Sequence, residues 1–130
     1  ALIKKIHKLK KNNKTELELW GDGSATREVV YVDDIANACV YFMNKRVKED
    51  IINIGTGIEY SIKEYAKILL KVINPGKKIR IVFDKSKPNG TPRKVMDIKR
   101  AKKYGWKPLN KLENSILKTY KSFLKEKNGT

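Results

Sequence analysis

The sequence has 130 residues and a mass of 15.0 kDa, the size of one domain and enough to build a hydrophobic core. Hydrophobic residues make up 40% of it and no stretch approaches the roughly 18 apolar residues of a membrane span, which excludes a spanning helix. The single cysteine, Cys39, and the single histidine, His7, exclude a disulfide framework, a cysteine zinc site and a histidine-rich metal site.

The net charge is +16, from 30 basic and 14 acidic residues. A basic surface attracts nucleic acid, but 25 of the basic residues are lysines, whereas base readout and bidentate phosphate contacts favour arginine. The lysines are spread along the whole chain, without a zinc-finger, RNA-binding or basic-zipper signature. We therefore expect mostly solvated lysines, a cytoplasmic protein, and a nucleic-acid-binding module only as an alternative.

Residues 1–11 carry apolar side chains at helical spacing, which predicts an amphipathic helix with Leu2, Ile6 and Leu9 on one side. His7 falls near the lysine-rich face of this helix, so a solvated histidine is expected. Ala1 already lies inside the apolar period without a preceding cap, and no apolar signal segment opens the chain. We expect the chain to be cut from a longer polypeptide.

Alternating polar and apolar residues predict a strand at 16–20, the run REVVYV predicts a second at 27–32, and a short apolar run predicts a third at 51–55. Between the last two, the sequence IANACVYFMNK predicts a helix. Asp33 is placed to cap this helix, with Asp34 as its solvent-exposed neighbour. Cys39 falls on the apolar helical face and is expected to be a buried, inert thiol.

The second half of the chain continues the alternation of helices and strands. A capping box, Ser61 with Glu64, opens a helix that runs through Ile73 and stops at Asn-Pro-Gly. A strand at 78–84, a polar loop at 85–94 and helices at 97–106 and 111–126 follow, with Asp97 as a cap and Gly105 as a stop. The predicted class is α/β, or α+β for the chain alone, with a small sheet and interleaved helices.

Two loops place glycines two residues apart after a strand, at Gly21–Gly23 and Gly55–Gly57. Such glycines suit either a phosphate loop, whose free amides meet an anion, or a tight turn that needs positive φ. Neither loop completes a dinucleotide or Walker fingerprint, so tight turns are favoured.

Trp20 and Arg27 flank the first of these loops. An aromatic plane next to a guanidinium suits a nucleobase with phosphates, but a core tryptophan and an ion-paired arginine fit the spacing as well. The loop 85–94 carries lysines and Arg93 and is held open by two prolines. Long polar loops of this kind are often functional, although a disordered surface loop remains the alternative.

A family resemblance adds to these patterns. The runs WGDGSATREVVYVDDIANA, INIGTGIEYSIKEYAKIL and FDKSKPNGTPRKVMDIKRAKKYGW resemble, in order, the C-terminal part of the GDP-L-fucose synthase family. This family belongs to the extended short-chain dehydrogenases/reductases, the NAD-dependent epimerases and dehydratases. SKPNGTPRK is the stretch specific to the fucose synthase branch.

The resemblance implies a fold and an activity. The chain would be a single substrate-binding lobe, residues 1–130, of an extended Rossmann-type enzyme whose N-terminal NADP-binding lobe is absent. The full-length enzyme would be a homodimer that converts GDP-4-keto-6-deoxy-mannose into GDP-L-fucose by 3,5-epimerisation and NADPH-dependent 4-keto reduction. A fragment of another nucleotide-sugar epimerase or dehydratase is the nearest alternative, and a ligand-free interaction domain is a further one.

The resemblance also implies five substrate-binding residues: Lys5, Trp20, Arg27, Asn89 and Lys94. Lys5 stands where relatives usually have arginine, and Asn89 where they often have aspartate, so both depart from the family pattern.

The catalytic groups of the family find no match in these residues. No glycine fingerprint, Tyr-x-x-x-Lys motif or cysteine and histidine acid–base pair matches, and Tyr41 with Lys45 has the right spacing outside the family's motif context. We therefore expect no catalytic residue in this chain. We also expect an exposed apolar patch where a missing lobe was, bordered by the first helix and residues 28–32.

Overall fold

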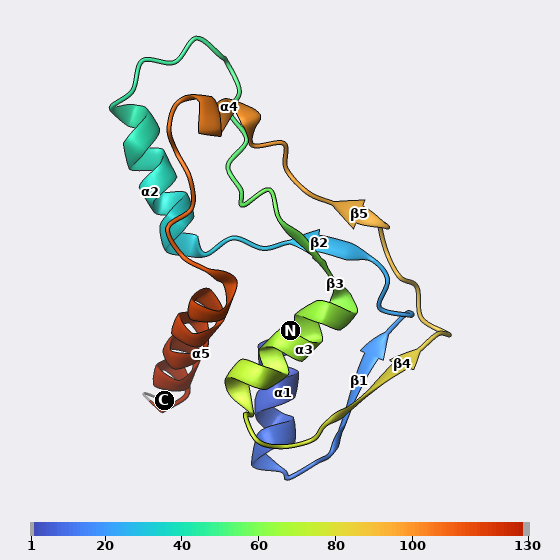
Figure 1. Ribbon diagram of the computed structural model, residues 1–130. Helices are drawn as coiled ribbons and strands as arrows, with labels where there is room; N and C mark the ends of the chain where they lie inside the picture. The colour runs from blue at the N-terminus through green and yellow to red at the C-terminus, as the bar shows by residue number, and fades with distance from the viewer. Residues whose placement is uncertain (1, 129–130) are drawn as a thin grey trace.

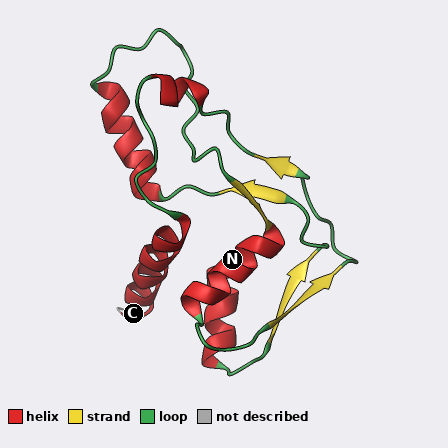
Figure 2. Ribbon diagram, in the orientation of Figure 1, coloured by secondary structure: helices red, strands yellow, loops and turns green. Residues whose placement is uncertain are grey.

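The structure, a computed structural model, describes residues 2–128. Helices and strands alternate along these residues (Figures 1 and 2). In chain order the elements are α1 (Leu2–Lys11), β1 (Glu16–Trp20), β2 (Thr26–Glu28), α2 (Val32–Met43), β3 (Glu59–Ser61), α3 (Ile62–Ile73), β4 (Arg80–Asp84), β5 (Arg93–Lys94), α4 (Lys99–Lys103) and α5 (Leu112–Asn128). No helix among the described residues combines the length and apolar character that a membrane crossing requires.

The strands form two small sheets. In the first, β1 and β4 pair in parallel, with Leu17 opposite Ile81 and Leu19 opposite Phe83. In the second, β2 is the central strand, antiparallel to β3 and parallel to β5. Because β2 pairs with a strand on each edge, this sheet brings together three segments that are far apart in the sequence.

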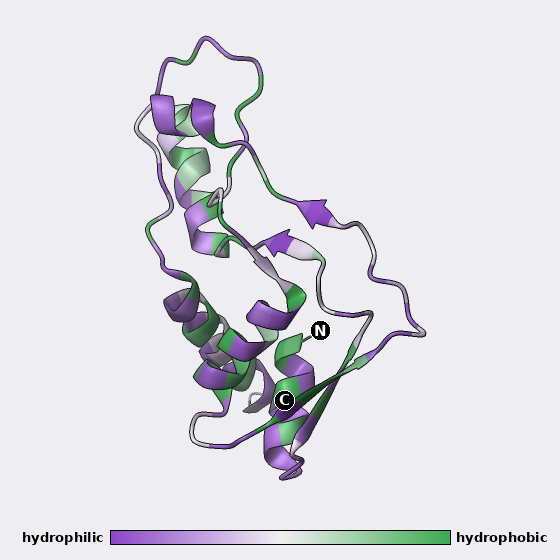
Figure 3. Ribbon diagram, turned by 45° about the vertical axis from the view of Figure 1, so that its right-hand side comes forward, coloured by the Kyte–Doolittle hydropathy of each residue, from purple (hydrophilic) through white to green (hydrophobic). Residues whose placement is uncertain are grey.

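The larger hydrophobic cluster lies where α1, α3 and α5 meet one face of β1 and β4. Leu17 and Leu19 are buried while Glu16, Glu18 and Trp20 are exposed, which is the alternation of a strand with one covered face. Figure 3 shows hydrophobic and hydrophilic residues alternating along these helices. Each buried Leu or Ile contributes roughly 1.5–3 kcal/mol. The buried members are Ile6, Leu9, Leu17, Leu19, Tyr65, Ala66, Leu69, Ile73, Ile116 and Tyr120.

A smaller cluster joins α2 to α4. Its buried members are Ala38, Ala101 and Trp106. The indole nitrogen of Trp106 donates a hydrogen bond to Oδ1 of Asn37 at 3.2 Å. Trp106 is thus the core tryptophan of this chain, with 3% of its surface exposed.

The helix with a predicted capping box, α3, is confirmed, whereas the helix expected at 97–106 covers only residues 99–103 and is preceded by Ile98, not by Asp97 as a cap. Ser61 Oγ accepts from the Glu64 amide at 3.2 Å, and the Glu64 carboxylate accepts from the Ser61 amide at 2.8 Å, so the capping box is complete. Hydrogen bonds to the Glu64 carboxylate from the Ser61 hydroxyl, and next from the Ser61 amide, lower the pKa of Glu64. Gly105 has a φ of +85°, the left-handed conformation expected of a helix stop.

One predicted strand is shorter than expected and another is absent. The strand expected at 27–32 ends at Glu28, and α2 already begins at Val32. Residues 51–55 form no strand, because no neighbouring segment offers them a ladder. Instead, the Arg100 guanidinium donates to the Ile51 carbonyl at 2.8 Å, while Ile52 and Ile54 pack against the smaller cluster. The short strands β3 and β5 lie in segments that were expected to be loops.

Four expectations about single side chains are also wrong. Asp34, expected to be exposed, is buried. Asp33 does not cap α2, because the residue that precedes this helix is Tyr31, which makes no side-chain cap. Cys39 is exposed, because the buried face of α2 centres on Ala38. His7 is half-buried and lies 3.0 Å from the Tyr120 hydroxyl, because α5 packs across this side of α1.

Candidate functional site

The candidate site begins at β2 and β5, where Arg27 and Lys94 are direct partners in the parallel ladder. Side chains at such paired positions lie on the same face of a sheet, so the two cations are neighbours. Arg27 is half-buried and its guanidinium donates to the Thr26 carbonyl at 2.6 Å, whereas Lys94 is exposed. Within residues 2–128, neither forms an ion pair with a carboxylate.

The neighbouring residue Arg93 differs in this respect. Its guanidinium donates to both oxygens of Glu59 at 2.8 and 3.0 Å, and Glu59 also accepts from the Thr26 hydroxyl at 2.7 Å. The hydrogen bond from Arg93 is the main cause of the lowered pKa of Glu59. Glu59 therefore neutralises Arg93, whereas Lys94 has no carboxylate partner within residues 2–128.

Trp20 ends β1 with 61% of its surface exposed, so it is not part of either hydrophobic cluster. The ammonium group of Lys87 lies 6.0 Å from the centre of its ring. This is a distance at which a cation interacts with the face of an indole. The loop 85–92 thus approaches the exposed ring of Trp20, the aromatic residue that the sequence pattern indicated as a candidate ligand contact.

Asn89 holds that loop against the turn that follows Trp20. Its Oδ1 accepts a hydrogen bond from the Asp22 amide at 2.7 Å, and the Asn89 side chain occupies the space where a Cβ on Gly21 would lie. On the other side of the loop, the Arg27 guanidinium lies 3.4 Å from the position of a Cβ on Gly90. The loop 85–92, which contains Asn89, therefore contacts both Trp20 and Arg27. It leads directly into β5, which includes Lys94.

Asp22 is an acidic residue that contacts this loop through Asn89. Its carboxylate accepts hydrogen bonds from the Ser24 hydroxyl at 2.6 Å and the Ser24 amide at 2.8 Å. These bonds, together with the one from Asn89, lower the pKa of Asp22 to about 2. The carboxylate is therefore ionised at neutral pH and shapes the turn between Trp20 and Arg27.

Lys5 lies apart from the other four residues. It is exposed on α1, and its ammonium donates to the Glu18 carbonyl at 3.3 Å, two residues before Trp20 on β1. It lines a separate cavity of about 250 Å³ with residues of α1 and the start of β1. The structure thus places Lys5 next to β1 but records no contact between it and the loop 85–94.

Glu28, which no sequence pattern marked, lies beside the candidate site. Its carboxylate accepts from the amides of Thr56, Gly57 and Met96, the last two at 2.6 Å. It also occupies the space where a Cβ on Gly55 would lie. This one side chain ties the 55–57 turn and the segment after β5 to β2, next to a groove of about 550 Å³ that Lys94 lines. No local pattern marks it, since its partners are 28 to 68 residues away.

The two glycine pairs form turns. Gly21, Gly23 and Gly57 have positive φ, as expected for glycines in tight turns. Side chains of Asn89 and Glu28 fill the space beside Gly21 and Gly55, so neither loop is an open phosphate cradle. These loops do not fit the pyrophosphate of a dinucleotide.

An apolar groove of about 410 Å³ borders α1 and residues 29–32, where an exposed patch was expected. Val32 and Val29 on its border have 69% and 46% of their surface exposed. The hydroxyl of Tyr65, which also lines the groove, is buried without a hydrogen-bond partner among the described residues. Burial raises the pKa of Tyr65 far above its usual value.

Comparisons with known proteins agree with the resemblance found in the sequence. A model of the NAD dependent epimerase/dehydratase family matches residues 1–55. The chain is 40% identical over 124 residues, 95% of its length and 37% of the relative's, to "Putative GDP-L-fucose synthase 2" of Arabidopsis thaliana. It is 43% identical over 130 residues, 99% of its length and 42% of the relative's, to "GDP-L-colitose synthase" of Yersinia pseudotuberculosis.

The fold agrees as well. A solved GDP-mannoheptose C4 reductase from Campylobacter jejuni with NADP bound superimposes with a TM-score of 0.81 and 32% identity, covering 95% of this chain and 43% of that one. The expected fold class, mixed α/β with small sheets, is confirmed. The chain spans about two fifths of the length of these curated relatives.

Proposed function

We propose, from the premise that this chain is a relative of the GDP-L-fucose synthases within the NAD dependent epimerase/dehydratase family, that it is the nucleotide-sugar-binding lobe of a GDP-sugar epimerase and reductase. The observation that carries the proposal is the pair of cations Arg27 and Lys94, which are neighbours in the sheet and lack carboxylate partners among the described residues. The exposed ring of Trp20 lies at the other end of the same loop.

The geometry suggests a role for each residue. Arg27 and Lys94 would hold the two phosphates, and each charge-assisted contact contributes roughly 1.5–3 kcal/mol. Trp20 would pack on the base or the sugar, where stacking contributes about 1–3 kcal/mol. Asn89 would position the loop through its bond to Asp22, and Lys5 would supply a further cation from α1.

The parent enzyme, in this proposal, is a cytoplasmic homodimer that uses NADP for a 3,5-epimerisation and a 4-keto reduction. The names of the relatives and the NADP-bound reductase support this view. NADP would be bound by an N-terminal Rossmann lobe, since the glycine turns described here do not fit it. That lobe would cover the apolar groove beside Val29 and Val32. The 130 residues alone would therefore bind the substrate without turning it over.

The sugar is the least constrained part of the proposal. SKPNGTPRK favours the fucose synthase branch, with GDP-4-keto-6-deoxy-mannose as substrate and GDP-L-fucose as product. The similarity to a colitose synthase and a mannoheptose reductase supports a sibling enzyme as the alternative. A panel of GDP-linked and UDP-linked keto sugars, tested on the full-length protein, distinguishes the two.

Isothermal calorimetry with GDP tests binding by the 130-residue chain. We expect heat on titration with GDP, and an affinity lowered roughly tenfold to hundredfold by Arg27→Ala or Lys94→Ala. Arg80→Ala is the matched control, because Arg80 is paired with Glu16 on an exposed part of β4. Heat with duplex DNA but none with GDP would contradict the proposal. Reduction of the 4-keto sugar by this chain with NADPH would contradict the expectation that the chain alone has no catalytic activity.

A further inference from the structure

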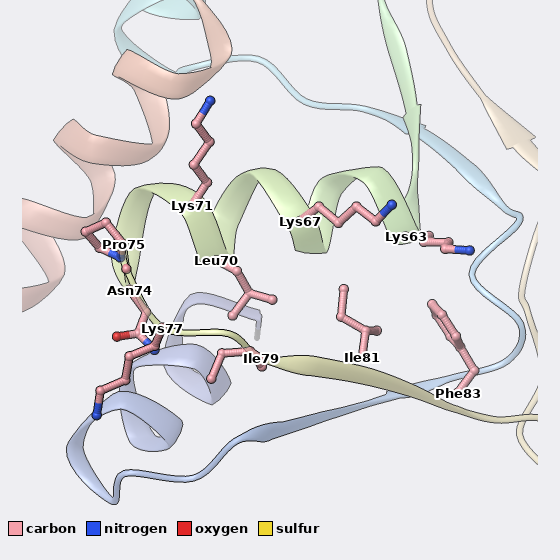
Figure 4. Close-up of a pocket in the computed structure, with 11 residues that line it drawn as sticks. Lys63, Lys67, Leu70, Lys71, Asn74, Pro75, Lys77, Ile79, Ile81 and Phe83 are labelled. Carbon is pink, nitrogen blue, oxygen red and sulfur yellow. The ribbon is translucent and has the colours of Figure 1, made fainter.

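A groove between α3 and β4 combines a hydrophobic floor with a cationic rim, and the function proposed above makes no use of it. Its volume is about 580 Å³. Ile81 and Phe83 point from β4 toward α3, Leu70 points from α3 toward β4, and Lys63 and Lys67 extend from α3 above this floor (Figure 4). No carboxylate side chain lines the groove, so its charge is entirely positive.

The two lysines are one helical turn apart, which is about 6 Å along the axis of α3. In Figure 4 their side chains run toward the Phe83 end of the groove, whereas Lys71, one turn further, points away from β4. No ion pair joins Lys63 or Lys67 to an acidic residue in the described part of the chain.

The groove also runs along an unpaired edge of β4. Within residues 2–128, β4 pairs with β1 alone. The Arg80 amide donates to the Thr15 carbonyl and the Asp84 carbonyl accepts from the Gly21 amide, both at 2.9 Å, so these two residues direct their backbone toward β1. Because successive residues alternate, Ile81 and Phe83 direct their amide and carbonyl groups toward the other edge.

This groove is separate from the candidate nucleotide-sugar site. Trp20 is paired with Asp84, and Leu19 is paired with Phe83. Since successive side chains of a strand point to opposite faces, Trp20 lies on the face of the sheet that α3 does not cover. The inference below therefore does not depend on the proposed function.

We propose that the groove binds an extended acidic segment of another protein, which adds as a third strand to the free edge of β4 and directs two acidic side chains at Lys63 and Lys67. Alternate residues of a strand are about 6.7 Å apart, close to the spacing of the two lysines. Main-chain hydrogen bonds to Ile81 and Phe83 would supply affinity, and the lysines would select acidic residues. A second copy of this chain, with its charge of +16, is disfavoured as the occupant.

The test uses the fluorescein-labelled peptide acetyl-Thr-Glu-Thr-Glu-Thr-Glu-Thr-amide and fluorescence polarisation with the 130-residue chain. We expect binding that the double variant Lys63→Glu/Lys67→Glu weakens about tenfold or more. Lys121→Glu makes the same charge change at an exposed lysine of α5 that does not line the groove, and it should alter the affinity less than about twofold. Circular dichroism confirms that each variant is folded.

Two methylated peptides test the strand pairing itself. Methyl groups on the glutamate amides or on the threonine amides block opposite edges of the peptide, so only one of the two should lose binding. Three outcomes would overturn the proposal: no binding of the parent peptide, equal binding of both methylated peptides, or displacement by inorganic tripolyphosphate at the concentration at which unlabelled peptide displaces.

Discussion

Asp34 in the first turn of α2 accepts two hydrogen bonds from Asn110, 76 residues later: one from the backbone amide at 3.3 Å and one from the side-chain nitrogen at 2.8 Å. It also accepts from the Leu109 amide at 3.1 Å, and only 2% of its surface is exposed. This carboxylate anchors the start of α2 to the segment that enters α5.

Removal of that carboxylate should be costly. Asp34→Ala removes a buried carboxylate and leaves the amides of Leu109 and Asn110 without their acceptor, and we expect the free energy of unfolding to fall by about 2–4 kcal/mol. Asp33→Ala is the matched control, because Asp33 is exposed in the same turn and should cost less than about 1 kcal/mol. Urea denaturation followed by circular dichroism measures both. Similar losses for the two variants would contradict the assignment.

The two tryptophans give a direct optical test of the candidate site. Trp20 is exposed beside the loop 85–92 and Trp106 is buried. Addition of GDP should therefore change the emission of Trp20 only, and Trp20→Phe should abolish the change and weaken binding by about 1–3 kcal/mol. Trp106→Phe should keep the change. If the signal instead disappears with Trp106, the ligand does not bind at Trp20.

Glu28 and Gly55 should be energetically coupled. Glu28→Ala leaves the amides of Gly57 and Met96 without their acceptor and should cost about 2–4 kcal/mol. Gly55→Ala places a Cβ against the Glu28 carboxylate and should cost about 1–3 kcal/mol. The double variant should cost less than the sum, because the Cβ then has room.

Gly76→Ala is the control for this cycle. Gly76 has a φ of +81° and open space around it, so its substitution strains only the backbone. We expect a cost of about 1–2 kcal/mol that is the same with or without Glu28. Additive losses at Gly55 would show that the contact with Glu28 is not what requires glycine there.

Stability should depend on pH through His7, the single histidine. Burial first, then the charges of Lys127, Lys11 and Lys10, lower the pKa of His7 below its ordinary value of 6.5. The unfolded chain therefore binds a proton more readily than the folded one. The free energy of unfolding should be constant above pH 7 and decrease as the pH falls below 6.5.

Urea denaturation at pH 7.5 and 5.5 measures this decrease, in a range that lies above the ordinary pKa of carboxylates. His7→Gln should remove most of the difference between the two pH values. A difference that persists unchanged in this variant would assign the pH dependence to other groups.

The helices were predictable because their signals are local. The Ser61–Glu64 capping box and the stop at Asn74–Gly76 bound α3 within the sequence itself, and the structure has both ends where these signals put them. β2, β3 and β5 were not predictable in the same way, because a strand of two or three residues is defined by its partners. The paired residues of β2 and β5 are 67 positions apart in the sequence, so no local periodicity predicts their register.

The same distinction explains the single residues. The local pattern around Asp34 marks a helix start, but it contains nothing about Leu109 and Asn110, which bury the carboxylate. For the candidate site, the residue types in the 85–94 loop and at Trp20 and Arg27 were visible in the sequence. The bond from Asp22 to Asn89, which draws the loop toward Trp20, joins residues 67 positions apart and could come only from the structure.

The division of the hydrophobic interior into two clusters has a thermodynamic consequence. The smaller cluster, with three buried residues, shares none of them with the larger one, and we expect α2 and α4 to exchange deuterium before α1, α3 and β1 do. Trp20 ends a strand of the larger unit, whereas Lys94 leads into α4 of the smaller one. A ligand that contacts both Trp20 and Lys94 would link two cooperative folding units, and its binding would slow the opening of the smaller unit.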